Sequence, residues 1–273
     1  MLENSAHPSV TRRPATGRRR TLSAIALLLL LLFAGLGIWQ VVRLQWKLAL
    51  IDRVDARVHA APVPLVPAPP HSLPWPAVDA EHDEYRHLRL TGHFLFDLTT
   101  PVQAVTERGT GFWLVTPLCQ PDGTAVLVNR GFIPGSLGAD SGYPVRSAGA
   151  NACAGNGATT TVTGLLRLSE PKGGFLRTND PAHQRWFSRD VAAIAAARGL
   201  PAVAPFFVDL DARQPGAATP LEPVAPIGGM TVISFPNNHL VYALTWFALA
   251  AMVGGAWWWV VRRGPGRRDD AAA

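Results

Sequence analysis

Two long apolar runs bracket the chain, and the segment between them alternates hydrophobic with polar residues. Neither residues 21–42 nor residues 240–261 contain an Asp, Glu, Lys or Arg. A helix of either length spans about 33 Å, which is enough to cross the hydrocarbon core of a bilayer. The pattern therefore predicts two transmembrane helices that enclose one extramembrane domain.

The first apolar run also has features of a cleaved signal peptide, because three arginines, Arg18 to Arg20, precede a leucine-rich stretch. No small-x-small cleavage site follows, and the chain continues with the bulky sequence "GIWQVVRLQWK". An uncleaved anchor is therefore the favoured interpretation. A mitochondrial transit peptide is a further alternative, since residues 1–20 are Arg-rich but short.

Beyond the first run the hydrophobic spacing stays helical for residues 43–59. Apolar residues recur there every three or four positions, at Leu44, Leu48, Ile51, Val54 and Val58. Seven prolines between positions 62 and 76 then end the helical pattern. We expect an amphipathic helix followed by a stiff, extended linker.

From residue 85 onward the hydrophobic period changes to two. Short runs rich in Val, Thr, Leu and aromatic residues are separated by turn signals such as "PDG" and "PKGG". The runs are "YRHLRLTGHFLF", "GFWLVTPL", "TAVLVNRGFI", "TTTVTGLLRL", "PFFVDLD" and "GMTVISF". They predict a mainly antiparallel β domain, a small barrel or sandwich, in a membrane-anchored α+β protein.

One helix is expected inside this domain, over the sequence "SRDVAAIAAARG". Ser188 is the predicted N-cap, Asp190 lies in the first turn, and an Ala-rich body follows. Gly199 stands where a left-handed C-terminal residue belongs.

The charge distribution predicts the orientation in the membrane. Only 16% of residues are charged and 48% are hydrophobic, and the net charge is +6. Residues 1–20 and 262–273 carry all of this excess, whereas residues 43–239 hold 16 basic and 16 acidic groups. The positive-inside rule places both tails in the cytoplasm and the domain outside it. A neutral domain without a basic stripe also argues against nucleic-acid binding.

Four motifs, in this order and between two membrane helices, resemble the surfeit locus 1 family of cytochrome c oxidase assembly proteins. They are "GLGIWQVVRLQWKLALI", "VLVNRGFIP", "GGFLRTNDPAHQRWFSRD" and "NNHLVYALTWFALA". The resemblance covers residues 35 to about 262. It implies a non-enzymatic helper that assists insertion of haem a, bound transiently, or stabilises the catalytic subunit of the oxidase. The implied partners are that subunit, the haem a synthesis machinery and the lipid bilayer.

His239 is the main candidate ligand. It follows Asn237 and Asn238, which are good cap residues, so it falls in the first turn of the second membrane helix. The positive end of a helix disfavours a second positive charge, and a neutral imidazole is the form that binds iron. Tyr242 and Trp246 share its helix face, and Ala243 and Ala250 leave room there for a flat partner.

The first helix brings a matching set of side chains to the same interface, namely Trp39, Gln40, Arg43, Trp46 and Lys47. Arg43 and Lys47 are four positions apart, so both cations could meet the propionates of a haem whose iron is near His239. The competing interpretation is structural, because aromatic belts, snorkelling cations and helix caps are ordinary at membrane interfaces.

Three other features have mainly structural interpretations. His82, Asp83, His87 and His93 lie on or near one strand, but Arg89 between the last two histidines opposes a cation site.

Cys119 and Cys153 are too far apart for a C-x-x-C motif, so they form either a disulfide or two free thiols. Arg130 ends an apolar strand, where a structural bridge is favoured over an anion site.

Two other classes of function fit the sequence less well. A two-helix extracytoplasmic sensor or binding protein would need an output domain, but the tails are short. An enzyme would need a catalytic motif, and G-x-S-x-G, H-E-x-x-H and P-loop sequences are absent. The Ala, Pro and Arg bias favours a bacterial inner membrane, with a mitochondrial inner membrane as the alternative.

Overall fold

The computed structural model describes residues 15–65, 75, 77–135, 146–149, 152–155, 157–171, 173–174, 176–219, 224–233 and 235–263. It contains two compact units, a helical unit up to Ile51 and from Ser234 onward, and a strand-rich unit over Asp52–Ile233. Most of both tails and most of the expected Pro-rich linker lie outside the described residues.

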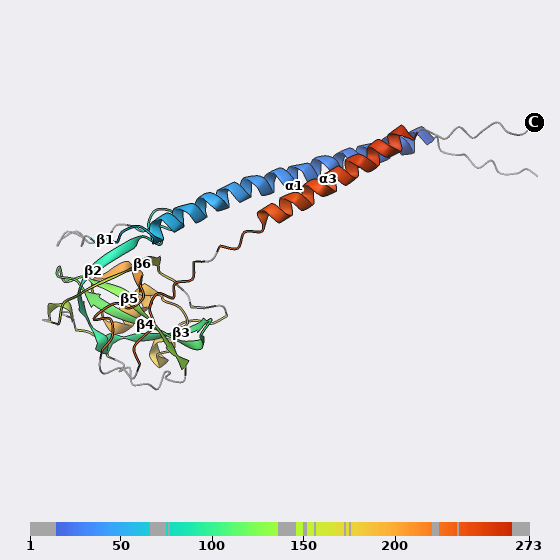
Figure 1. Cartoon of the computed structure of the whole chain (residues 1–273). Coiled ribbons are helices and arrows are strands. Elements are labelled where there is room, and N and C mark those ends of the chain that lie inside the picture. The colour runs from blue at the N-terminus through green and yellow to red at the C-terminus, as the bar shows by residue number, and fades with distance from the viewer. Residues whose placement is uncertain are drawn as a thin grey trace, which may run out of the picture. The chain divides into compact units, whose positions relative to one another are not determined.

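The helical unit is built from α1 (Ala15–Val58) and α3 (His239–Arg262), drawn blue and red in Figure 1. The predicted membrane helix over 21–42 and the amphipathic helix over 43–59 form one continuous helix. Leucines such as Leu28 and Leu31 are exposed along it, unlike those of a buried core helix. Both helices are long and apolar enough to cross a membrane, as predicted, which fits a membrane-anchored protein.

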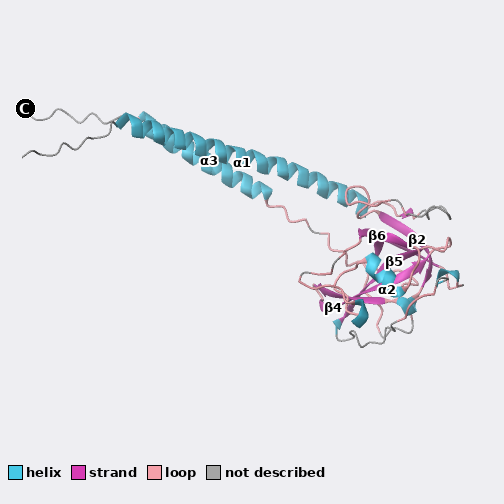
Figure 2. Ribbon diagram, turned by 180° about the vertical axis from the view of Figure 1, so that it is seen from behind, coloured by secondary structure: helices cyan, strands magenta, loops and turns pink. Residues whose placement is uncertain are grey.

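The strand-rich unit contains a closed five-stranded barrel, so the predicted fold class is confirmed. Its strands are β2 (His87–Phe94), β4 (Gly109–Cys119), β5 (Ala125–Pro134), β6 (Thr160–Leu168) and β7 (Val203–Leu210). They pair in the order β2-β6-β7-β5-β4, and pairing of β2 with β4 closes the ring. Figure 2 shows these strands in magenta with α2 (Val191–Arg198) beside them.

Two short edge strands extend the sheet. β3 (Thr100–Thr106) pairs with β4, and β1 (Val63–Pro64) pairs in parallel with β2. β1 belongs to the expected extended linker, and its prolines are compatible with an edge position, where the sheet needs no donor on one side. Three single-turn 3₁₀ helices, η1 (Phe96–Leu98), η3 (Ala152–Ala154) and η4 (Pro181–His183), complete the described elements.

Both faces of the barrel wall are buried at β5 and β7. Val126 and Val128 contribute to one apolar cluster with Phe206 and Val208, whereas Leu127 contributes to a second cluster. The second cluster packs under α2, through residues that include Val191 and Ile194. The near-continuous apolar runs in these strands are explained by this two-sided burial, which lets alternate side chains enter different cores.

Two expectations about local structure are wrong. The run "GMTVISF" is not a strand in its described part, 229–233. Gly229 adopts a positive φ and donates its N–H to Leu210 O, so the chain bends across β7 there and does not join a ladder. The N-cap of α2 is Asp190, whose carboxylate accepts from Ala193 N, and not Ser188. Gly199 closes that helix in the left-handed conformation, as predicted.

Candidate functional site

His239 is the first residue of α3, and a side chain of α1 fixes its imidazole. Its Nδ1 lies 2.8 Å from the Oε1 of Gln40, which is almost fully buried. The N-cap residue Asn238 makes no side-chain cap bond, but the Oδ1 of Asn237 accepts from the His239 backbone N–H at 3.4 Å. The predicted interfacial histidine therefore has a specific polar partner, and the sequence placed Gln40 nearby without assigning it that role.

The three aromatic side chains predicted near His239 differ in position. One packs between the two helices and two face outward. Trp246 stacks on Phe33 of α1, with ring centroids 5.7 Å apart. Trp39 and Tyr242 are more than half exposed. The structure therefore does not gather the three around His239, because Trp246 packs between the helices and the other two face outward.

The predicted cations also have aromatic neighbours. The guanidinium of Arg43 lies over the ring of Trp46, 4.1 Å from its centroid. The ammonium of Lys47 lies 5.0 Å from the ring centroid of Phe235, just before α3. Arg43 and Lys47 are one turn apart on α1, and the positive charge of each lies against an aromatic ring.

The small residues of α3 do not leave an empty slot between the helices. Ala243 and Ala250 are buried, and a Cβ on Gly37 of α1 would approach the ring of Phe247 to 2.6 Å. Gly254 also faces Leu30 of α1. The expectation that these alanines leave room for a flat partner is therefore corrected, because the first helix occupies that space.

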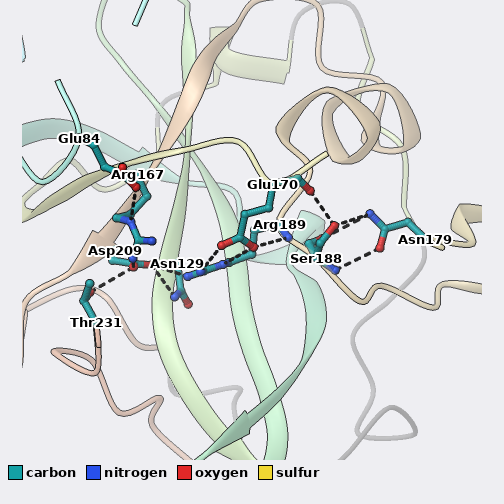
Figure 3. A network of polar contacts seen from close by, with 9 residues as sticks. All are labelled: Glu84, Asn129, Arg167, Glu170, Asn179, Ser188, Arg189, Asp209 and Thr231. Carbon is teal, nitrogen blue, oxygen red and sulfur yellow. Dashed lines mark hydrogen bonds and ion pairs between the residues drawn. The ribbon is translucent and has the colours of Figure 1, made fainter. Parts of the chain in front are cut away.

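In the strand-rich unit, Asp209 is the centre of a buried polar network. Asp209 of β7 is 4% exposed and stands beside Asn129 of β5 in the sheet register. Its Oδ1 accepts from Asn129 Nδ2 at 2.7 Å and from Arg189 Nη1 at 2.9 Å. Its Oδ2 accepts from Thr231 Oγ1 at 3.1 Å and from Arg167 Nη1 at 3.3 Å. Four donors thus saturate one buried carboxylate, as Figure 3 shows.

The two arginines extend this network to further carboxylates (Figure 3). Arg167 also bonds Glu84, and Arg189 forms a bidentate pair with Glu170, with Nη2 2.5 Å from Oε1 and Nε 3.1 Å from Oε2. Burial by itself would raise the pKa of Glu170, but the hydrogen bonds and charge of Arg189 hold that pKa below its ordinary value. Burial would lower the pKa of Arg189, but the charges and hydrogen bonds of Asp209 and Glu170 together more than compensate, so this pKa is raised.

The outer end of the network organises the loop before α2. Asn179 Oδ1 accepts from the backbone N–H groups of Phe187 and Ser188, at 2.8 and 3.1 Å. Ser188 Oγ donates to Glu170 O at 2.7 Å. The sequence motif "TNDPAHQRWFSRD" is therefore a loop held by its own polar side chains, a role that the sequence did not assign to Asn179.

A cavity of about 220 Å³ lies beside this network, lined by residues that include Trp113, Arg167, Arg189, Asp209 and Thr231. The charged side chains that line the cavity, Arg167, Arg189 and Asp209, already pair with one another. Thr231 belongs to the segment that leaves the barrel after Gly229, so its bond to Asp209 ties that segment to β7. The network therefore has a structural role, because it holds the segment after Gly229 at the point where the chain leaves the barrel.

The sequence matches a known family. The family model described as "SURF1 family" matches residues 27–251, which cover the barrel and most of α1 and the first half of α3. The chain belongs to the SURF1 family.

Curated relatives agree with this assignment. Surfeit locus protein 1 of Rattus norvegicus is 32% identical over 250 residues, which are 85% of this chain and 73% of that protein. The Homo sapiens protein of the same name is 32% identical over 248 residues, covering 84% and 74%. A SURF1-like protein of Drosophila melanogaster is 31% identical over 250 residues, covering 85% and 75%.

The cysteines of this SURF1 family member form a disulfide, which settles the alternative that the sequence left open. Cys119 at the end of β4 is bonded to Cys153 in η3, with their Cα atoms 5.2 Å apart. The bond links the segment after β5 to the end of β4, where β4 pairs with β2 and closes the barrel.

Arg130 is buried in this SURF1 family barrel. Its Nε donates to Thr116 Oγ1 at 2.7 Å and its Nη1 to Ala217 O at 2.9 Å. Its guanidinium also lies over the ring of Phe96, 4.9 Å from the centroid. These contacts agree with the structural role expected for this residue.

The histidine-rich strand supplies no metal cluster among the described residues of this family member. His87 bonds Ala60 O and Asp211 Oδ2, both at 2.8 Å, and His82 bonds Asp79. His93 shares the outward face of β2 with His87, as predicted from the strand period.

Proposed function

We propose that this SURF1 family protein is a non-enzymatic assembly factor for a haem–copper cytochrome c oxidase. It would assist insertion of haem a into the catalytic subunit or stabilise that subunit while it accepts haem. The observation that carries the proposal is the contact between His239 and Gln40, because a histidine prepared for a metal usually has its second ring nitrogen held by an oxygen.

The protonation pattern of this contact favours ligation. A glutamine Oε1 can only accept, so the Nδ1 of a neutral His239 carries the hydrogen, and the lone pair remains on Nε2. No partner of Nε2 is present among the described residues. His239 would hold the haem iron through its Nε2.

In this proposal a haem lies on the exposed side of the helix pair. The interior is filled at Gly37, Ala243 and Ala250, so a haem would approach from outside. Tyr242 and Trp39 offer exposed aromatic surface there. Arg43 and Lys47 are the cations for the two propionates, and Trp246 supports the helix pair through Phe33.

The proposed location is a bacterial inner membrane, with both tails in the cytoplasm and the barrel outside. The disulfide between Cys119 and Cys153 supports an oxidising compartment for the barrel. The basic tails support the orientation through the positive-inside rule. In this setting the partners are the membrane-embedded catalytic subunit and the enzymes that make haem a.

A haem-retention experiment tests the ligand assignment. The full chain is co-expressed with haem a synthesis enzymes, purified in a nonionic detergent, and its Soret absorbance is measured per protein. We expect His239→Ala to lose the Soret band and His59→Ala, an exposed histidine directly after α1, to retain it. An unchanged Soret band in His239→Ala would exclude His239 as the ligand.

A second experiment tests the assembly role separately. Deletion of the gene should lower oxidase activity and oxidase haem content and leave other respiratory complexes intact. An intact oxidase in the deletion strain would instead favour a two-helix binding or sensor protein.

A further inference from the structure

A cavity of the strand-rich unit lies between the edge strand β3 and the loop before α2. Its volume is about 610 Å³, within the range of sites that hold small organic ligands. Pro101 and Gln103 of β3 line one side, Phe112 of β4 lies beside them, and residues 176–187 line the other side. It is separate from the saturated network around Asp209.

The charged groups of this cavity are mostly cationic. Arg177, Arg185 and Arg198 line it, and Asp180 is the single acidic residue of its lining. The hydrogen bond from His183 holds the pKa of Asp180 below its ordinary value, so that carboxylate is ionised and already has a partner. The cavity therefore carries an excess of about two positive charges at neutral pH.

Arg198 supplies a positive charge that no acidic side chain neutralises within the described residues. It is 1% exposed, and it donates to Thr100 Oγ1 at 2.8 Å, Thr99 O at 3.1 Å and Arg146 O at 3.4 Å. All three acceptors are neutral. A buried charge in a low-dielectric surrounding is weakly screened, so its field reaches the cavity and favours an anion.

Arg177 and Arg185 stand at the accessible side of the cavity. Their guanidinium carbons lie 5.3 and 5.7 Å from the ring centroid of Phe187, and Arg177 also donates to Gln103 Oε1 at 2.7 Å. Neither makes an ion-pair contact within 4.0 Å among the described residues, although the charge of Arg185 also acts on Asp180. An oxyanion in the cavity would therefore meet two exposed cations in its lining, each supported by the ring of Phe187.

The lining of the cavity also contains apolar surface and a residue whose hydrogen-bond donor has no partner. Phe112 and Phe187 are partly exposed, and Trp186 lines the cavity with a buried Nε1–H that has no acceptor. A buried donor without a partner is costly.

We propose that this cavity binds a small organic oxyanion, a carboxylate or a phosphate monoester, carried on an apolar body. The oxyanion lies against Arg177 and Arg185, and the body contacts Phe112 and Phe187. This site does not depend on the proposed haem role of His239.

Fluorine NMR on the full chain in a nonionic detergent tests the proposal with defined probes. The probes are 4-fluorobenzoate and 4-fluorophenyl phosphate, and 4-fluorobenzamide is the uncharged control of similar shape. We expect at least one anionic probe to bind about tenfold or more tightly than the amide, since charge-assisted hydrogen bonds contribute about 1.5–3 kcal/mol. The tighter of the two anions identifies the head group, and acetate should displace neither.

Matched variants locate the binding. The double variant Arg177→Gln/Arg185→Gln removes two exposed charges, so it should fold normally and lose about tenfold or more in affinity for the anionic probe. Arg213→Gln, an exposed arginine that does not line this cavity, should bind as the parent does. Equal binding of amide and anions, displacement by acetate, or unchanged binding by the double variant would each overturn the proposal. Haem retention at His239 should be the same in all of these variants.

Discussion

The Nδ1 of His239 lies 2.8 Å from the Oε1 of Gln40, and these residues are 199 positions apart on different helices. The contact joins the start of α3 to the middle of α1, in a helix pair that also has apolar contacts such as the stacking of Trp246 on Phe33. A polar contact in such a surrounding fixes the rotation of both helices, because an unpaired amide would be costly there. The same contact sets the tautomer of the imidazole.

Substitution of Gln40 should therefore reduce haem retention without removing the proposed ligand. We expect Gln40→Leu to lower the affinity for haem by about tenfold or more, the usual effect of losing an orienting partner of a metal-bound histidine. Gln40→Glu keeps an acceptor and should retain haem. The Soret absorbance per protein measures both, and Gln45→Leu, on the exposed side of α1, is the control. Equal loss in Gln40→Leu and Gln40→Glu would contradict a role for the acceptor oxygen.

The buried carboxylate of Asp209 should be the most sensitive acid in the barrel. Asp209→Asn keeps the shape but removes the buried carboxylate that pairs with both Arg167 and Arg189, and breaking a buried ion pair costs about 3–5 kcal/mol. Thermal unfolding of the full chain measures this loss. Asp97→Asn breaks an exposed contact to Arg146 at 3.7 Å, which is worth less than about 1 kcal/mol. Similar shifts in the two variants would mean that the network contributes little.

Gly131 should tolerate no side chain. Its φ is +136°, a region open essentially to glycine, and an added Cβ would lie 2.4 Å from the backbone of Ile227. We expect Gly131→Ala to cost roughly 3 kcal/mol or more in unfolding free energy. Gly123 also has a positive φ, but open space surrounds it, so Gly123→Ala should cost only about 1–2 kcal/mol. Equal melting temperatures of the two variants would show that the segment at Ile227 moves aside easily.

Local periodicity was sufficient to predict most of the fold. The two membrane helices follow from runs without charge, and five of the six predicted strands match β2, β4, β5, β6 and β7. "GMTVISF" has the same alternation but is no strand, because Gly229 bends the chain and Thr231 bonds Asp209. β3 was missed, because "TPVQAVT" has a proline and little apolar content, and it pairs only at the sheet edge.

The site residues were harder to predict because their partners are distant in the sequence. His239 was recognised from its place at a helix start, whereas its contact with Gln40 depends on the rotation of two helices. Asp209 gave one sequence signal, an acid inside the apolar run "PFFVDLD", but its four donors come from four separate segments. Long-range side-chain pairing of this kind is determined by packing and not by local spacing.

The disulfide should contribute strongly to the stability of the barrel. It closes a loop with a sequence separation of 34, for which the loss of chain entropy in the unfolded state corresponds to about 4 kcal/mol. The double variant Cys119→Ala/Cys153→Ala should melt at a clearly lower temperature than the parent. Reduction of the parent before unfolding is the control, and it should lower the melting temperature by a similar amount. An unchanged melting temperature in the double variant would show that the loop is already restrained in the unfolded chain.

The pairing of Glu170 with Arg189 should make the barrel sensitive to acid. The pKa of Glu170 is lowered in the folded state, so its contribution to stability is complete above its ordinary value of 4.5 and is lost as the pH falls through the depressed folded value. Glu170→Gln has no proton to gain, so its unfolding free energy should depend less on pH below about 4.5. Chemical unfolding at a series of acidic pH values measures the slope, with Glu81→Gln, at an exposed pair with Arg53, as the control. An equal slope for the parent and Glu170→Gln would show that other carboxylates cause the loss of stability in acid.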